Sequence, residues 1–321
     1  MVAHFTAAVS LGERKLVDYF TWSWLQEVLT FSLMPPLLIF AGLVFRSVRA
    51  QPSNVLGHLG ETLRENRERF FYGFLFILIY LIVHRAYRAL KVAIPRHNEY
   101  WADPMFASWD KAIFGQDPWL ITHSMVGPLG TQFIDMLYVV WLPVMLISFG
   151  FAAFAKDSQF RKRATLSFFL TWILLGNLLA TLFASVGPCF YAEFYGSDRF
   201  TPLMDLLSHQ NLAALKLQET LRMTVGDEAI GSGISAVPSL HCAITMIVVL
   251  MVHDRYGWDW RTYLAIAYHV IIWFGSVHLG WHYAVDGMIS TALIPFIWWA
   301  SGKIVTLSER LPKKQPAPAV A

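Results

Sequence analysis

The sequence predicts an all-α protein, a polytopic membrane helix bundle of six to seven transmembrane helices, and three observations support this. Hydrophobic residues make up 56% of the 321 residues and charged residues only 15%, and the mean hydropathy is +0.46. Soluble proteins carry about 25% charged residues, so this chain has too few to cover a water-exposed surface. Apolar runs long enough to cross about 30 Å of hydrocarbon recur along it. Disordered, coiled-coil and disulfide-stapled secreted proteins are excluded by the same composition.

The apolar runs divide the chain into three parts. Residues 1–69 comprise an amphipathic lead-in with Trp22 and Trp24 suited to the membrane interface, a first span and a basic loop. Residues 70–301 form the membrane core, and residues 302–321 form a cytoplasmic tail that we expect to be disordered. The fifth run is short and the last two nearly touch, which leaves six or seven spans. The runs lie at 26–46, 70–90, 133–155, 164–186, 239–254, 262–280 and 283–301.

Basic residues predict how the bundle is oriented. They cluster after the first, third, fifth and last runs, and if the spans alternate, all four clusters lie on one side. The positive-inside rule makes that side cytoplasmic. Segments 91–132, 187–238 and the hinge around 278–286 then lie on the outer side. We expect an integral protein of a bacterial plasma membrane. The clusters comprise Arg46, Arg49, Arg64, Arg67, Arg69, Lys156, Arg161, Lys162, Arg163, Arg255, Arg261, Arg310, Lys313 and Lys314.

The charge balance and the cysteines exclude two other classes of protein. The chain has 25 Lys and Arg against 22 Asp and Glu, which is too even to indicate a nucleic-acid partner. Cys189 and Cys242 are too few for a disulfide framework. They could pair with each other because both lie near the outer face, but we favour two free buried thiols.

The first group of unusual polar residues enters the fifth run as Pro238-Ser239-Leu240-His241. Pro and a capping Ser are normal at the start of a helix. A helix N-terminus offers free N–H groups and the positive end of the dipole, which suit a phosphate group. The alternative is a capped helix with an interfacial histidine, and this segment alone supports both interpretations equally.

The second group contains His282 and Asp286, four residues apart, so that on a helix they share one face within hydrogen-bonding reach. An Asp that accepts the Nδ1 proton of a His leaves Nε2 with a free lone pair, which makes the ring a base or a nucleophile. Ionisable residues at membrane depth indicate function, although a polar cluster that only anchors the helix is the alternative. We predict His282 and Asp286 as catalytic residues on the outer face.

Together these residues resemble a known family. Pro238-Ser239-Leu240-His241 followed by His282-x-x-x-Asp286 resembles the second and third signature motifs of the type 2 phosphatidic acid phosphatase (PAP2) superfamily. The His-Tyr-x-x-Asp form is similar to the inositol phosphorylceramide synthase branch, as are the stretch 110–118 and Gly187-Pro188. The resemblance covers roughly residues 70–300 and implies a PAP2-like helical core.

The resemblance implies a lipid phosphatase or phosphotransferase that acts on a phospholipid or lipid phosphate without a metal or cofactor. His282 would attack phosphorus and carry a phospho-histidine intermediate, Asp286 would orient it, and His241 would protonate the leaving oxygen. Ser239 and the N–H groups after it would hold non-bridging oxygens. The branch favours transfer of a phospho-headgroup to an alcohol such as an inositol or sugar hydroxyl.

The chain departs from the family pattern where the phosphate should be bound. Ser276 stands where the third motif normally has Arg, and the first motif's basic residues are spaced differently. Arg88, Lys91 and Arg96 lie in the right region and are the candidate phosphate ligands. The alternative is that these side chains snorkel at the outer end of their span.

Two other functions remain open at this point. His278, His282 and Asp286 follow one another at i+4 spacing and could bind a metal in a membrane oxidoreductase, although Gly280 interrupts the helical pattern. A non-catalytic lipid-binding or transport protein that keeps the fold is the other alternative. It predicts that His241, His282 and Asp286 tolerate replacement.

Overall fold

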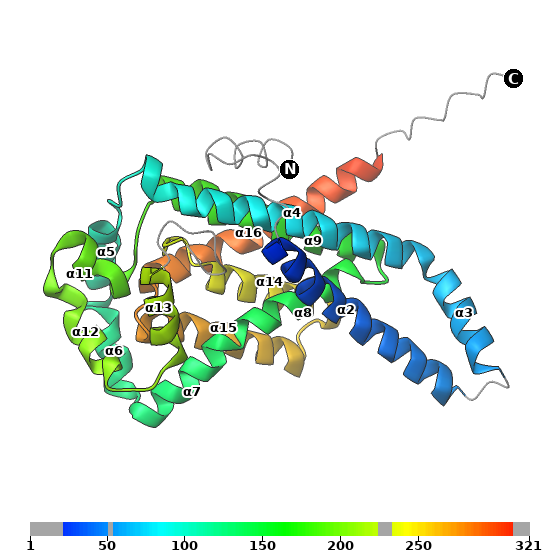
Figure 1. Ribbon diagram of the computed structural model, residues 1–321, viewed down its shortest axis with the longest axis horizontal. Coiled ribbons are helices and arrows are strands. Elements are labelled where there is room, and N and C mark those ends of the chain that lie inside the picture. Colours follow the sequence, from blue (N-terminus) through cyan, green and yellow to red (C-terminus); the bar gives the residue numbers. More distant parts are fainter. Residues whose placement is uncertain (1–21, 51–53, 224–232, 311–321) are drawn as a thin grey trace, which may run out of the picture.

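The structure is a computed structural model that describes residues 22–50, 54–223 and 233–310. All regular secondary structure in these residues is helical and none of them lies in a strand, which confirms the predicted all-α class. Helix α2 (Trp22–Arg49) leads through α3 (Val55–Glu65) into α4 (Arg67–His97). Helix α4 runs along most of the length of the molecule in Figure 1.

Four helical stretches within the described residues are long and apolar enough to cross a membrane, namely 67–95, 128–153, 158–182 and 284–310. The second joins α7 (Pro128–Val139) to α8 (Trp141–Ala153). The predicted spans near 239–254 and 262–280 are the shorter helices α14 (Leu240–Tyr256) and α15 (Trp260–His278). The multi-span helical character is therefore confirmed, whereas the total of six or seven spans stays a prediction.

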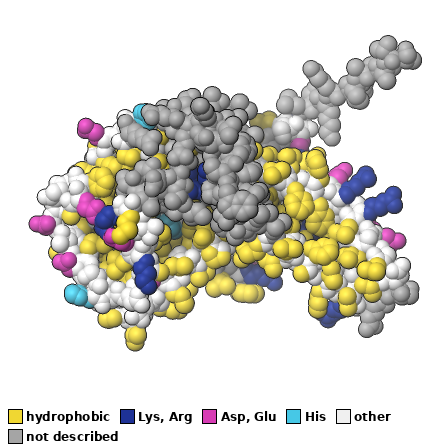
Figure 2. Space-filling view, in the orientation of Figure 1, with side chains coloured by type: hydrophobic (Ala, Val, Ile, Leu, Met, Phe, Trp, Pro, Cys, Tyr) yellow, Lys and Arg dark blue, Asp and Glu magenta, His cyan; other side chains and the backbone are white. Residues whose placement is uncertain are grey.

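The core of the bundle forms around α14, which packs against α15, α9 (Ser158–Ile173) and α16 (Ala284–Arg310). Between α8 and α9 the side chains of Phe149, Phe168 and Trp172 are at most 2% exposed. Lipid tails are as apolar as these side chains, so close packing stabilises this core more than removal from water does. Hydrophobic side chains also cover much of the surface in Figure 2, as expected for a lipid-facing exterior.

A π-helical segment, Leu174–Leu179, interrupts the third candidate span before α10 (Ala180–Leu182) and lets α4 approach closely. A Cβ atom on Gly176 would lie 2.8 Å from the ring of Tyr87. The side-chain amide of Asn177 donates a hydrogen bond to the carbonyl of Tyr87 at 3.0 Å. Such bulges are frequent at functional sites, and this one brings the second half of α4 beside the bundle.

Short helices gather at the end of the molecule where α4 finishes (Figure 1). They belong to the segments 91–132 and 187–238, which the sequence analysis expected on one side. Which side of a membrane they face stays a prediction. These helices are α5 (Asp103–Phe114), α6 (Pro118–Met125), α11 (Tyr191–Tyr195), α12 (Thr201–Ser208) and α13 (Ala213–Met223).

Both cysteines are free and buried, as predicted. Helix α16 continues to Arg310, into the segment 302–321 that the sequence analysis assigned to a tail. The remainder of that tail, the lead-in 1–21 and the side chains of Trp22 and Trp24 lie outside what the structure describes.

Candidate active site

His282 lies in the turn between α15 and α16. Helix α15 ends at His278, and Gly280 takes the left-handed conformation with φ +73. The N–H groups of Trp281 and His282 both donate to the carbonyl of Ser276, at 2.9 and 3.1 Å. His282 therefore precedes the helix that carries Asp286, and the two do not share one continuous helix as the sequence analysis assumed. The turn nevertheless brings them into contact.

Asp286 is fully buried and binds two segments at once. Its Oδ2 is 3.0 Å from Nδ1 of His282, and its Oδ1 accepts the N–H of Ser239 at 2.8 Å. A carboxylate in this position accepts the Nδ1 proton, so that Nε2 of His282 keeps its lone pair. The contact predicted from the spacing is thus present in the structure.

His241 stands in the first turn of α14, with its ring 5.6 Å from the ring of His282 between centroids. Tyr138 stacks on it at 4.6 Å and Trp141 lies at 4.2 Å. The indole N–H of Trp141 also donates to the carbonyl of His241 at 3.2 Å. These aromatic contacts pack the imidazole between α7 and α8, next to the ring of His282.

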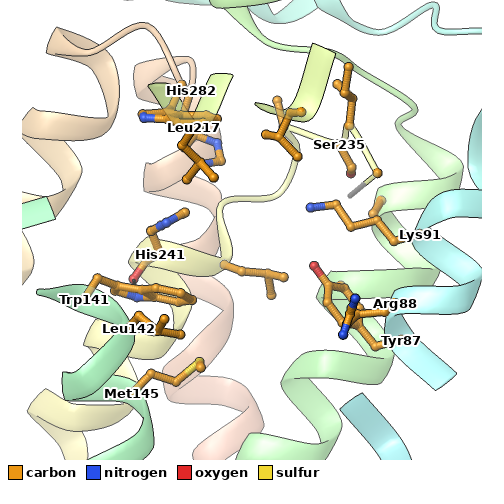
Figure 3. Close-up of a pocket in the computed structure, with 18 of the residues that line it drawn as sticks. Tyr87, Arg88, Lys91, Trp141, Leu142, Met145, Leu217, Ser235, His241 and His282 are labelled. Atoms are coloured by element: carbon orange, nitrogen blue, oxygen red, sulfur yellow. Dashed lines mark hydrogen bonds between the residues drawn. The ribbon is translucent and has the colours of Figure 1, made fainter. Parts of the chain in front are cut away.

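The two histidines line one cavity of about 410 Å³. In Figure 3 they lie on one side of it, and Lys91 points into it from the opposite side. The part farther from His282 is apolar and aromatic. It is lined by Tyr80, Leu81, Trp141, Leu142, Met145, Leu146 and Trp172. Val139 and Leu142 belong to the lining and are 53% and 42% exposed, so the cavity opens on the side of the bundle.

Of the three basic residues predicted to bind phosphate alongside Ser239, the structure brings two to the cavity. Arg88 is buried and Lys91 is half-buried, and both line the wall that α4 forms. They are three residues apart on one helical face, as the sequence analysis proposed. The side chain of Arg96 lies outside what the structure describes. With Arg88 and Lys91 on one wall, the cavity suits an anionic ligand.

Ser239 does not line this cavity. Its side chain is fully buried, and Oγ accepts the N–H of Cys242 as the cap of α14, at 3.4 Å. The peptide bond between Val237 and Pro238 just before it is cis. A neighbouring hydroxyl, that of Ser235, belongs to a residue that does line the cavity, opposite the histidines (Figure 3). The contact of Ser239 with phosphate oxygens stays a prediction.

His278 does not join His282 and Asp286. Its ring is buried between two hydroxyl groups, with Nδ1 3.0 Å from Oγ1 of Thr122 and Nε2 2.9 Å from Oγ1 of Thr131. His123 stacks on it at 3.7 Å. Both ring nitrogens are thus occupied away from the cavity. Among the described residues no three His, Cys, Asp or Glu side chains are grouped so that they could hold a metal ion.

Two buried carboxylates that sequence reasoning did not assign hold the loops around the cavity. Asp110 of α5 accepts the N–H groups of Ala284 and Val285 at 2.8 Å each, and so caps α16 from another helix. Asp103 accepts the N–H groups of Val186 and Gly187 and the hydroxyl of Tyr283. Burial raises the pKa of Asp110 to about 6 and also raises that of Asp103, while these hydrogen bonds oppose the increase.

A third carboxylate, Asp135 of α7, lines the cavity and caps α13. It accepts the N–H groups of Ala213 and Ala214 at 2.7 and 2.9 Å. Leu217 and Leu221 of α13 also belong to the cavity lining, so this contact holds α13 over the site. Asp135 carried a sequence signal, because it is an ionisable residue in the predicted apolar run 133–155. Asp103 and Asp110 lie in the polar segment 91–132 and carried none of this kind.

Residues 106–300 match the family model described as PAP2 superfamily. No curated protein and no solved structure matches significantly. The matched region includes His241, His282, Asp286, Asp110 and Asp135, whereas Arg88, Lys91 and Asp103 precede it.

Proposed function

The chain belongs to the PAP2 superfamily, and from that premise we propose that it is an integral-membrane enzyme that removes or transfers a phospho group of a lipid. Membership of the superfamily suggests phosphatase-type activity. The observation that carries the proposal is that His282, in contact with Asp286, shares one cavity with His241 and faces it.

The chemistry follows from the positions of these groups. With its Nδ1 proton directed at Asp286, His282 presents the Nε2 lone pair to phosphorus. As the bond from Nε2 to phosphorus forms, the bond to the leaving oxygen breaks, and His241 supplies a proton to that oxygen. In the second half His241 takes the proton of the acceptor, whose oxygen displaces the histidine. The proposed phospho-histidine intermediate needs no metal, because cationic side chains can neutralise the transferring group.

Arg88 and Lys91 are proposed to stabilise the non-bridging oxygens. They lie across the cavity from the histidines, so the phospho group would sit between the two walls. They would replace the third-motif Arg of the family, whose position Ser276 occupies in this chain. Ser276 itself is buried and its hydroxyl donates to the carbonyl of Trp273 at 2.7 Å, so it is not a phosphate ligand in this proposal.

The shape of the cavity supports a lipid substrate. Its apolar part would hold acyl chain near Met145 and Leu146 while the headgroup reaches the histidines. The side opening at Val139 and Leu142 would admit lipid from a bilayer. We further propose six or seven spans with the site on the outer side of a bacterial plasma membrane, on the distribution of basic loops.

The acceptor decides between the two reactions. Water would make the enzyme a phosphatase, and an alcohol would make it a phosphotransferase. The His-Tyr-x-x-Asp motif, similar to that of the inositol phosphorylceramide synthase branch, favours transfer of a phospho-headgroup to an alcohol.

The test uses the purified full chain in lipid-containing detergent, both with and without EDTA. Radiolabelled phosphatidic acid and phosphatidylinositol are supplied with and without ceramide or diacylglycerol, and both free phosphate and new lipid are followed. We expect the wild type to form one of these products and His282→Ala to form neither. His209→Gln, on an exposed residue after α12, is the matched control and should behave as wild type.

Free phosphate alone would establish a phosphatase, and a new phospholipid would establish the transferase and identify its acceptor. Equal turnover by wild type and His282→Ala would overturn the phospho-histidine mechanism. Activity that EDTA abolishes would overturn metal independence. Absence of turnover on every lipid would favour a non-catalytic lipid-binding protein.

A further inference from the structure

A second cavity, of about 220 Å³, lies between α2, the start of α4 and α8. Most of its wall is apolar, formed by residues that include Leu38, Leu43 and Phe151. Leu38 and Phe151 are 56% and 65% exposed, so this cavity is an open groove on the surface of the bundle. Nothing in the proposed reaction uses it.

Two arginines close one end of the groove. Arg46 of α2 and Arg69 of α4 belong to its lining, and Arg161 of α9 lies close enough to Arg69 to interact with it electrostatically, as Arg46 does. Arg69 donates through Nε to the carbonyl of Phe154, which is a neutral acceptor. Within the described part of the chain no carboxylate forms an ion pair with Arg46 or Arg69.

The groove is far from the histidine site. Arg69 and Lys91 lie near opposite ends of α4, about 33 Å apart by the rise of an α-helix. That distance is close to the thickness of a bilayer's hydrocarbon core. An occupant of the groove would therefore sit in the leaflet opposite to that of the catalytic cavity.

We propose that this groove binds one anionic phospholipid. Its phosphate-bearing headgroup would lie on Arg46 and Arg69, and an acyl chain would run along the apolar wall between α2 and α8. Clustered guanidinium groups without carboxylate partners favour a net negative headgroup over a zwitterionic one. A phospholipid is favoured over a free phosphate, because a free phosphate would make no contact with the apolar wall of the groove. Each arginine near a membrane surface favours an anionic lipid by about fivefold.

Gly42 provides a way to test the groove without changing its charge. It lines the groove on α2, and a Cβ atom there meets nothing within 4 Å. Gly42→Leu should therefore fill the space that the acyl chain would occupy while leaving both arginines in place. Leu is also a better helix former than Gly, so the variant should fold.

The experiment places the full chain in phosphatidylcholine nanodiscs that contain a trace of photoactivatable phosphatidylglycerol or, separately, photoactivatable phosphatidylcholine. After illumination, peptides are mapped for crosslinked lipid. In the wild type we expect the α2 peptide, and α8 at Gly150 and Phe151, to be labelled at least fivefold more by phosphatidylglycerol. These two residues line the groove and not the catalytic cavity. Arg46→Gln combined with Arg69→Gln should bring that ratio close to one, and Gly42→Leu should lower labelling by both lipids.

Arg49→Gln is the matched control, because Arg49 is an exposed arginine of the same helix that does not line the groove. It should keep the wild-type ratio. Equal labelling by both lipids in the wild type, or a ratio unchanged in the double variant, would overturn the proposal. Loss of labelling on adding glycerol phosphate would identify a soluble phosphate as the ligand and would also overturn it. His282→Ala should label as wild type, so the result is independent of the proposed reaction.

Discussion

Asp286 accepts the N–H of Ser239 at 2.8 Å with one carboxylate oxygen, while its other oxygen lies 3.0 Å from Nδ1 of His282. Ser239 begins α14, which carries His241 in its first turn. A single buried carboxylate thus positions both histidines relative to each other. Through Asp286, the start of α14 and the turn before α16 are joined, although they are more than 40 residues apart in the sequence.

The first prediction concerns this carboxylate. Asp286→Asn should keep a hydrogen bond to Ser239 but donate to Nδ1 of His282, which would place the ring proton on Nε2 and remove the nucleophilic lone pair. We expect kcat to fall about 10⁴-fold, by analogy with the loss of the correct tautomer in a Ser-His-Asp triad. Turnover of the best lipid substrate measures this. Wild-type kcat in a folded Asp286→Asn protein would contradict it.

The second prediction concerns Lys91, whose amine points into the cavity opposite the histidines (Figure 3). Lys91→Gln removes one positive charge from the phosphate-binding wall without changing length greatly. We expect kcat/KM to fall about 10- to 100-fold, in line with the loss of one charge-assisted hydrogen bond. Steady-state kinetics check this. Lys111→Gln, at an exposed position of α5, should leave kcat/KM unchanged. Equal effects of both variants would indicate a general charge effect.

Composition and motif spacing were sufficient to predict the helical membrane bundle and the pairing of His282 with Asp286. The bundle could be predicted because long apolar segments indicate membrane spans directly. The pair could be predicted because residues four apart can still touch when the first lies in the turn before a helix and the second in its first turn. The spacing did not predict that His282 precedes the helix, since that depends on Gly280 and on the carbonyl of Ser276. The spacing also did not predict that His278 lies apart from His282 and Asp286, because the hydroxyl groups that contact its ring belong to α6 and α7.

The supporting carboxylates were missed for a related reason. Asp103, Asp110 and Asp135 each cap a segment at least 78 residues away in the sequence. A cap supplied by the same chain segment leaves a recognisable local pattern, whereas a cap supplied from another helix leaves none. Ser239 shows the local case, because the sequence indicated a helix cap and its hydroxyl accepts the N–H of Cys242. Its contact with phosphate oxygens stays a prediction.

The third prediction tests the apolar part of the cavity. Met145 is 3% exposed and lines that part, so Met145→Phe should shorten the space for an acyl chain. We expect turnover of long-chain lipids to fall several-fold more than turnover of short-chain lipids with the same headgroup. Competition assays with pairs of chain lengths measure this. Leu182→Phe, at an exposed position, is the control. An equal loss for all chain lengths would contradict an acyl-chain site.

The fourth prediction concerns Gly187, where three loops meet. Its φ is +86, its N–H donates to Asp103, and an added Cβ would lie 2.6 Å from the carbonyl oxygen of Trp281. Gly187→Ala should therefore displace the turn that carries His282, lowering both turnover and stability, the latter by roughly 2 kcal/mol or more. Gly196→Ala is the matched control, because φ there is +59 with nothing within 4 Å. Gly196→Ala therefore measures only the free energy of placing a non-glycine residue in the left-handed conformation, about 1 kcal/mol.

Thermal unfolding in detergent and lipid turnover should be measured on both glycine variants. We expect Gly196→Ala to keep wild-type turnover with a small loss of stability, and Gly187→Ala to lose both. Similar stability of the two variants would show that the contact with Trp281 does not constrain the turn.

The fifth prediction concerns pH and Asp110, which caps α16. Burial raises its pKa in the folded protein from the ordinary value 3.8 to about 6. Between these two values the folded state binds a proton that the unfolded state has released. The stability contributed by this group is therefore complete below pH 3.8 and is lost as pH rises through about 6. The difference corresponds to at most about 3 kcal/mol.

Asp110→Asn should reduce this dependence, because its amide does not titrate and its oxygen still accepts one N–H from Ala284 or Val285. Unfolding of the wild type and the variant is measured in detergent from pH 4 to pH 8. We expect the wild type to lose more stability than the variant across that range. Burial also raises the pKa of Asp103, which the variant retains. The variant's stability should therefore still fall with rising pH, but less steeply than that of the wild type. Identical slopes would mean that Asp110 stays ionised throughout, with the two N–H groups of α16 outweighing the effect of burial.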